Sequence, residues 1–134
     1  MSAFDALAAS AHLQALADKH RIKMTYRQSG WQSFPSTRQA WVPEPSTAKR
    51  YLVALHELGH IASATARRRG NQDYPALGVE VLVEGAAWAW ATAVADPTLL
   101  LGVTKREWSD VFSYFGSYLL YACMQAPPAS MPSI

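Results

Sequence analysis

The chain has 134 residues, half of them hydrophobic, which is enough to bury the core of one domain. Its formal net charge of +2 is too small to indicate a nucleic-acid partner. The single cysteine, Cys123, excludes an internal disulfide and fits a reducing compartment. The N-terminus lacks the pattern of a signal peptide, and Asp96-Pro97 interrupts the most apolar stretch, 85–103. We therefore expect a cytoplasmic protein without a membrane span.

The first forty residues predict a helix followed by two short strands. Apolar residues at mixed three- and four-residue spacing indicate an amphipathic helix over 2–20. Polar and apolar residues alternate over 21–27, which indicates a half-buried strand. A second strand is expected over 38–42. Because Pro43 follows it directly, we interpret this second strand as an edge strand.

The rest of the chain is predicted to be helical. Ser46 is the expected N-cap of a helix over 47–69, and an alanine-rich helix follows over 79–95. Capping-box spacing opens a third helix over 105–124. Residues 126–134 hold three prolines and are expected to be a flexible tail. The predicted fold is one α+β domain over 1–125, mostly helical, with a small N-terminal β-sheet.

The predicted helix over 47–69 contains the motif His-Glu-x-x-His. His56 and His60 are four residues apart, so they share one helix face and can reach the same Zn²⁺. Glu57 follows the first histidine and is placed to act as a general base on a water at that metal. The three residues thus predict two metal ligands and one base.

The simpler interpretation of this motif is a surface helix with solvated polar side chains. The flanking residues argue against it, because Val53 to Ile61 is otherwise apolar or small. A buried helix does not accommodate two histidines and a carboxylate unless something satisfies them. Gly59 costs helix stability and clears space beside His60 for a close neighbour or a substrate. The surroundings therefore favour a metal site.

A zinc site needs a third protein ligand, and in this chain it has to be a carboxylate. No histidine follows His60, while His12 and His20 are expected to be surface or capping residues of the first helix. The next helix offers two carboxylates, Glu80 and Glu84. A glutamate from a following helix is the gluzincin arrangement, and the motif alone leaves both candidates open.

Two blocks of the sequence resemble the ImmA/IrrE family of small zinc metallopeptidases. The blocks are residues 55–60 and residues 84–91, with a proline after them, and the resemblance covers about residues 38–97. The second block of that family reads E-x-x-A-N-x-F-A. The matching positions are Glu84, Ala87, Trp90, Ala91 and Pro97. Trp88 departs from the family, which has asparagine there.

The resemblance implies a zincin-like (minigluzincin-like) fold, with Glu84 as the third ligand. Family members are encoded by phages, other mobile elements and bacterial chromosomes, and commonly act on a repressor protein. The residues next to Glu84 are small, which lets its helix approach the motif helix closely. Glu80 has no counterpart in the family, and a carboxylate in the first helical turn is favoured by the helix dipole without any metal.

These expectations combine into a zinc-dependent endopeptidase with one Zn²⁺ per chain and a protein or peptide substrate. Glu57 would take a proton from the attacking water and pass it to the leaving amine. The expected edge strand would bind the substrate by strand addition, through the residues Arg38, Gln39, Ala40, Trp41 and Val42. Candidates for stabilising the oxyanion are Tyr74, Tyr114 and Tyr118.

Two other functions compete with the endopeptidase. One is a catalytically silent, zinc-stabilised binding module that sequesters a regulatory or host protein. The other is a small helical adaptor without metal, which requires both blocks to be accidental. The intact Glu57 favours the enzyme, because a purely structural metal site has no use for a base beside the metal.

Overall fold

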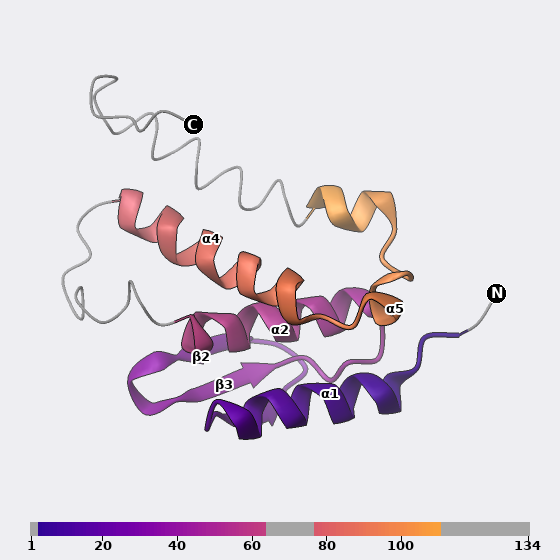
Figure 1. Cartoon of the computed structure of the whole chain (residues 1–134), viewed down its shortest axis with the longest axis horizontal. Helices are drawn as coiled ribbons and strands as arrows, with labels where there is room; N and C mark the ends of the chain where they lie inside the picture. Colours follow the sequence, from indigo (N-terminus) through magenta and orange to yellow (C-terminus); the bar gives the residue numbers. More distant parts are fainter. Residues whose placement is uncertain (1–2, 64–76, 111–134) are drawn as a thin grey trace.

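The computed structural model describes residues 3–63 and 77–110. They form a mostly helical α+β domain with one small sheet (Figure 1). The helices are α1 (Ala6–Lys19), α2 (Ala48–Ala62), α4 (Leu77–Val94) and α5 (Pro97–Leu100). The strands are β1 (Lys23–Tyr26), β2 (Gln32–Phe34) and β3 (Gln39–Val42), with a 3-10 turn, η1 (Pro35–Thr37), before β3. A further helical run covers residues 105–110.

The sheet is mixed, and its strand order is β1-β3-β2. Strand β3 pairs in parallel with β1, Lys23 opposite Gln39, and antiparallel with β2, Ser33 opposite Ala40. The expectation that residues 38–42 form an edge strand is therefore wrong, because β3 is the central strand. Pro43 is compatible with this place because it comes after Val42, the last paired residue, and removes no hydrogen-bond donor from the ladder.

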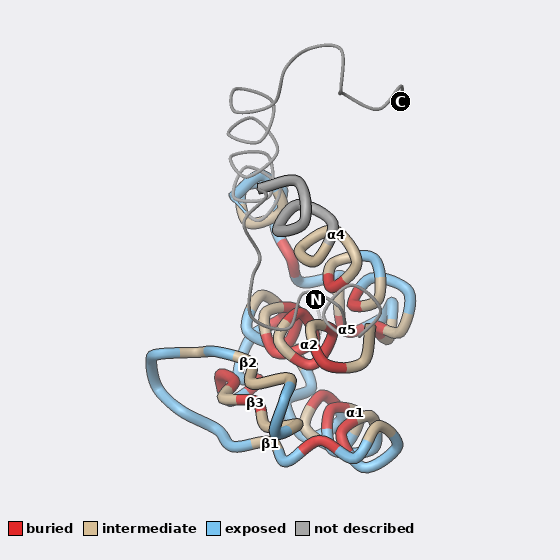
Figure 2. The backbone as a smooth tube through the Cα atoms, turned by 90° about the vertical axis from the view of Figure 1, so that its left-hand side faces the viewer, coloured by how far each residue is buried: buried red, intermediate tan, exposed pale blue. Residues whose placement is uncertain are grey.

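Helix α2 is the centre of the molecule. The sheet and α1 pack on one side of it and α4 on the other (Figure 1), and the buried parts of the chain gather along it (Figure 2). Its largest fully buried side chains are Tyr51, Leu52, Leu55, Leu58 and Ile61. With apolar residues on several faces, α2 contacts both the sheet and the other helices, and among its polar residues His56 is buried while Glu57 and His60 are half-buried.

The ends of α2 differ from the predicted ones. Thr47 rather than Ser46 is the N-cap, and its hydroxyl accepts a hydrogen bond from the Arg50 amide at 3.1 Å. At the other end the helix stops at Ala62 and does not continue through Ser63. The Ser63 hydroxyl donates to the Gly59 carbonyl at 2.5 Å, a local hydrogen bond that competes with helix continuation. The rest of the predicted helix, 64–69, lies outside the described residues.

The remaining helices are confirmed in type. The dipeptide Asp96-Pro97 ends α4 as predicted and also starts α5, which was not predicted, because the Asp96 carboxylate accepts from the Thr98 amide at 3.0 Å. The predicted capping box before the next helix is present, with reciprocal bonds between Thr104 and Glu107. Residues 111–134, which include the predicted tail, lie outside the described residues. Among those described, no helix is long and apolar enough to cross a membrane.

Candidate metal centre

Three side chains from α2 and α4 converge at one point. The Nε2 atoms of His56 and His60 are 3.2 Å apart. Glu84 lies against both, with Oε2 at 2.8 Å from His60 Nε2 and Oε1 at 3.2 Å from His56 Nε2. Among the described residues, these are the three whose potential ligand atoms form a group that could hold a metal ion, all within 4.8 Å of one another.

The geometry of these donors fits one small cation. Donors bound to a tetrahedral Zn²⁺ at about 2.0–2.1 Å stand about 3.3 Å apart. The two histidine Nε2 atoms, at 3.2 Å, are close to that separation. The lone pairs of two neutral imidazoles would repel each other and the Glu84 carboxylate where the three groups converge. A proton or a cation among the three groups removes this repulsion. Two imidazole nitrogens and one carboxylate oxygen are a ligand set that Zn²⁺ accepts.

Close contact between α2 and α4 makes this convergence possible. A Cβ atom built on Gly59 would lie 2.6 Å from the main-chain oxygen of Ala87, which is closer than real Cβ contacts. Gly59 therefore makes room for a neighbouring helix, as interpreted from the sequence. Ala87 is fully buried and lies one turn after Glu84, so the two helices approach each other closely next to the metal site.

The Glu84 carboxylate is held in its ionised form. Burial raises the pKa of Glu84, but hydrogen bonds from His56 and His60, together with their charges, outweigh burial and lower the pKa to about 2. An ionised carboxylate is the state that binds a metal, so no proton has to be displaced from it near neutral pH. This supports the prediction that Glu84 is the third ligand. The side chain of Glu80, the other candidate, lies outside the described part of α4.

Glu57 lies beside the three donors without belonging to them. Burial raises its pKa, the charges of His56 and His60 oppose that rise, and the charge of Glu84 adds to it. A hydrogen bond with the side chain of Ser33 also lowers the pKa. Ser33 belongs to β2, so the carboxylate of Glu57 faces β2, one of the two outer strands of the sheet.

Trp88 packs directly on one ligand. Its ring is stacked on the imidazole of His56, with centroids 3.9 Å apart and planes inclined by 22°. The buried Nδ1 atom of His56 has no hydrogen-bond partner within the described residues. The ring of His60 meets that of His56 edge-on instead, at 73°. The sequence showed that Trp88 departs from the asparagine of the resembled family, but it did not predict this stack.

The structure does not support substrate binding by strand addition to residues 38–42. Both edges of β3 are paired with other strands, so its main chain offers no free edge. Its side chains are also engaged: Ala40 and Val42 are fully buried. The ring of Trp41 packs against that of Phe34, with centroids 4.7 Å apart, and Arg38 donates a hydrogen bond to the carbonyl of His20. The edge strand next to Glu57 is β2, which we did not predict. Gln32–Phe34 reads polar, polar, apolar, so it shows no alternation, and three residues are too few to distinguish a strand from a turn.

The other predicted residues lie elsewhere. Tyr74, Tyr114 and Tyr118 are outside the described residues. His12 does not join the centre, because its Nδ1 forms a 2.6 Å hydrogen bond with the hydroxyl of Tyr51. The same hydroxyl accepts from the Asp96 amide at 2.9 Å, so Tyr51 connects α1, α2 and the start of α5. His12 thus joins α1 to α2 through the hydroxyl of Tyr51.

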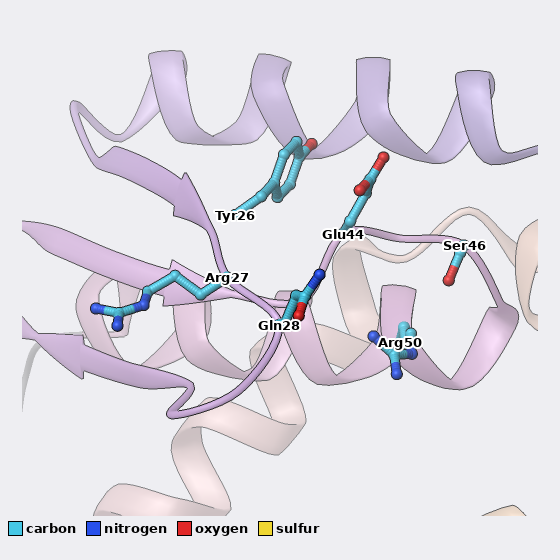
Figure 3. A pocket seen from close by; sticks show the side chains of 6 residues that line it. All are labelled: Tyr26, Arg27, Gln28, Glu44, Ser46 and Arg50. Atoms are coloured by element: carbon cyan, nitrogen blue, oxygen red, sulfur yellow. The ribbon is translucent and has the colours of Figure 1, made fainter.

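A separate pocket of about 440 Å³ opens at the start of α2 and the ends of β1 and β3 (Figure 3). Its lining residues are Tyr26, Arg27, Gln28, Glu44, Ser46 and Arg50. In Figure 3 the guanidinium group of Arg27 points away from the others, and it lies 4.0 Å from the ring centroid of Trp41. The side chains here carry charges of both signs and do not converge, so the His56 centre remains the candidate functional site.

Comparison with protein-family models, with curated proteins and with solved structures finds no match to this chain.

Proposed function

We propose that this chain is a zinc-dependent endopeptidase of the ImmA/IrrE type, with a zincin-like fold, acting on a protein substrate in the cytoplasm. The observation that carries the proposal is the convergence of Glu84 on His56 and His60, with Glu57 beside them. The helix spacing predicts only the histidine pair, and a third donor arriving from α4 completes a ligand set that leaves one zinc position open.

Each polar residue of the centre then has one task. His56, His60 and Glu84 hold the metal, and Glu57 stays outside the ligand set. A bound Zn²⁺ supplies Lewis acidity, which polarises the scissile carbonyl and makes a water more acidic. Glu57 takes the proton of the attacking water and returns it to the leaving amine. A base in this place distinguishes a hydrolytic site from a structural one.

Substrate alignment falls to β2 rather than to residues 38–42. Within residues 3–63 and 77–110, strand β2 is paired on one side only, and its other edge would add an extended peptide by main-chain hydrogen bonds. Its central residue, Ser33, interacts with Glu57. A peptide bound along this edge would therefore pass over the general base. The oxyanion donor remains among the predicted tyrosines, Tyr74, Tyr114 and Tyr118. The substrate class we propose is a repressor or another regulatory protein.

Metal analysis is the first test of the proposal. We expect about one Zn²⁺ per chain, lost in the double variant His56→Ala/His60→Ala. Stoichiometric zinc in that variant would show that the metal binds elsewhere.

Capture with Glu57→Gln is the second test. This variant keeps the ligands, so it should bind zinc and retain a substrate without cutting it. Proteins retained on it from a lysate are incubated with the wild type, with the double histidine variant as control. Cleavage by the wild type alone is the expected result. A captured protein that the wild type never cuts would favour the zinc-stabilised binding module instead, and equal cleavage by Glu57→Gln would remove Glu57 from the mechanism.

A further inference from the structure

His56 and His60 have the same role in the centre but different surroundings. Trp88 is one helical turn after Glu84 on α4, and its ring lies nearly parallel to that of His56 at 3.9 Å between centroids. His60 touches the same imidazole only edge-on, with centroids 4.6 Å apart. The ring of His56 is therefore fixed by a flat aromatic surface on one side.

The hydrogen bonding of His56 is unusual for a metal ligand. A ligating histidine almost always donates its other ring N–H to an acceptor, and this bond fixes both the orientation of the ring and its tautomer. The Nε2 atom of His56 faces Glu84 and His60, so Nδ1 is the atom that should donate. Nδ1 is buried, and the described residues offer it no hydrogen-bond partner. Within the described part of the chain, the contact that can hold this ring is its stack with Trp88.

We propose that Trp88 is a positioning residue of the metal centre, whose indole face holds the His56 imidazole in the orientation that directs Nε2 at the metal. This inference rests on the proposed metal site. The stack opposes rotation of the imidazole out of its plane, which is the motion that a hydrogen bond to Nδ1 normally prevents. The ring also covers His56 from water. Glu84 and Trp88 are four residues apart, so one face of α4 supplies both a ligand and the support of another ligand.

Zinc affinity measured by chelator competition tests this role without any cleavage assay. Trp88→Leu keeps an apolar side chain of some bulk but removes the aromatic face, and we expect it to weaken zinc binding by about 10–100-fold. Trp88→Phe restores a flat ring and should bind within a few-fold of the wild type. The matched control is Trp90→Leu, because Trp90 lies on the same helix but meets His20 rather than a ligand; it should also stay within a few-fold.

The proton spectrum of the wild type gives a second readout that does not depend on a variant folding. Protons above an aromatic face are shifted upfield, so the ring protons of His56 should resonate upfield of those of His60, with and without zinc. The difference should shrink in Trp88→Phe and vanish in Trp88→Leu.

The outcomes separate this inference from the proposed function. A wild type that binds no zinc refutes the metal centre, and the inference with it. Zinc binding that is unchanged in a folded Trp88→Leu refutes the positioning role alone. Should Trp88→Leu fail to fold, His56 ring protons at ordinary positions in the wild type, or a large loss of affinity in Trp88→Phe, would overturn the inference.

Discussion

Replacing Gly59 by alanine tests whether helix contact positions the third ligand. The new Cβ would lie 2.6 Å from the carbonyl oxygen of Ala87, whereas ordinary contacts begin at 3.4 Å, a shortfall of 3.4 − 2.6 = 0.8 Å. The obstacle is main chain on both sides, so no side chain can turn away. Helix α4 has to move away from α2 by a comparable distance.

Two opposing effects determine the stability of Gly59→Ala. Alanine is better than glycine inside a helix by about 1 kcal/mol. Forcing a methyl group into a packed contact costs about 1–3 kcal/mol. We therefore expect the metal-free variant to be between unchanged and about 2 kcal/mol less stable than the wild type, which leaves a folded protein to measure.

The effect on the metal should be larger than the effect on the fold. Glu84 is one turn from Ala87 on α4, so it moves with the displaced helix, and ligand distances tolerate only about ±0.2 Å. We expect zinc affinity to fall by about tenfold or more, measured by chelator competition, while denaturant unfolding of the metal-free protein gives the stability.

Gly102→Ala is the matched control for Gly59→Ala. It adds the same methyl group, here 3.3 Å from the side chain of Ala48, at the other end of α2. Zinc affinity should be unchanged in this variant. If Gly59→Ala binds zinc as tightly as the wild type and gains the full 1 kcal/mol of helix propensity, the two helices do not approach as described and the reasoning fails.

Three further outcomes can be measured on the same protein. Glu84→Ala should weaken zinc binding by about 100-fold or more, because losing even a residue that hydrogen-bonds to a ligand lowers metal affinity by about 10–100-fold. Glu80→Ala should keep the zinc affinity within a few-fold, and dissociation constants in the opposite order would assign the ligand to Glu80. Tyr51→Phe removes the hydroxyl that bonds His12 and Asp96, so denaturant unfolding should show a loss of about 1–2 kcal/mol with zinc affinity kept; an unchanged stability would mean that this connection contributes nothing. Free zinc at 100 times its dissociation constant should raise the free energy of unfolding by about 2.7 kcal/mol, reversed by chelation, and a melting temperature that ignores zinc would exclude binding to the folded state.

Elements with a strong local signal were predicted well. Helices α1 and α4, strands β1 and β3 and the start of α2 lie within a few residues of their expected places, because each has a periodic pattern or clear end signals. Two of the missed elements, β2 and α5, are three and four residues long. Such short segments hold no full period of either pattern; β2 forms by pairing with β3, and α5 starts at the Asp96 cap.

The arrangement of the strands could not be read from the sequence. Pro43 suggested an edge position for residues 38–42, yet a proline after the last paired residue leaves both edges of the strand usable. Whether a third strand occupies the second edge depends on Gln32–Phe34 folding back through η1, which is a tertiary event. Because β3 is the central strand, the strand edge proposed to bind the substrate is that of β2 and not that of β3.

The sequence by itself determined the part of the centre that lies within one helical turn. The spacing of His56 and His60 brings two imidazoles onto one face, and Glu57 follows beside them, because helix geometry depends only on neighbouring residues. Contacts between elements decided the rest. Glu84 reaches the histidines because Gly59 lets α4 approach α2, and Trp88 covers His56 because it sits one turn further along the same face of α4. Side-chain packing between two helices depends on their distance and rotation, and only the folded chain sets those.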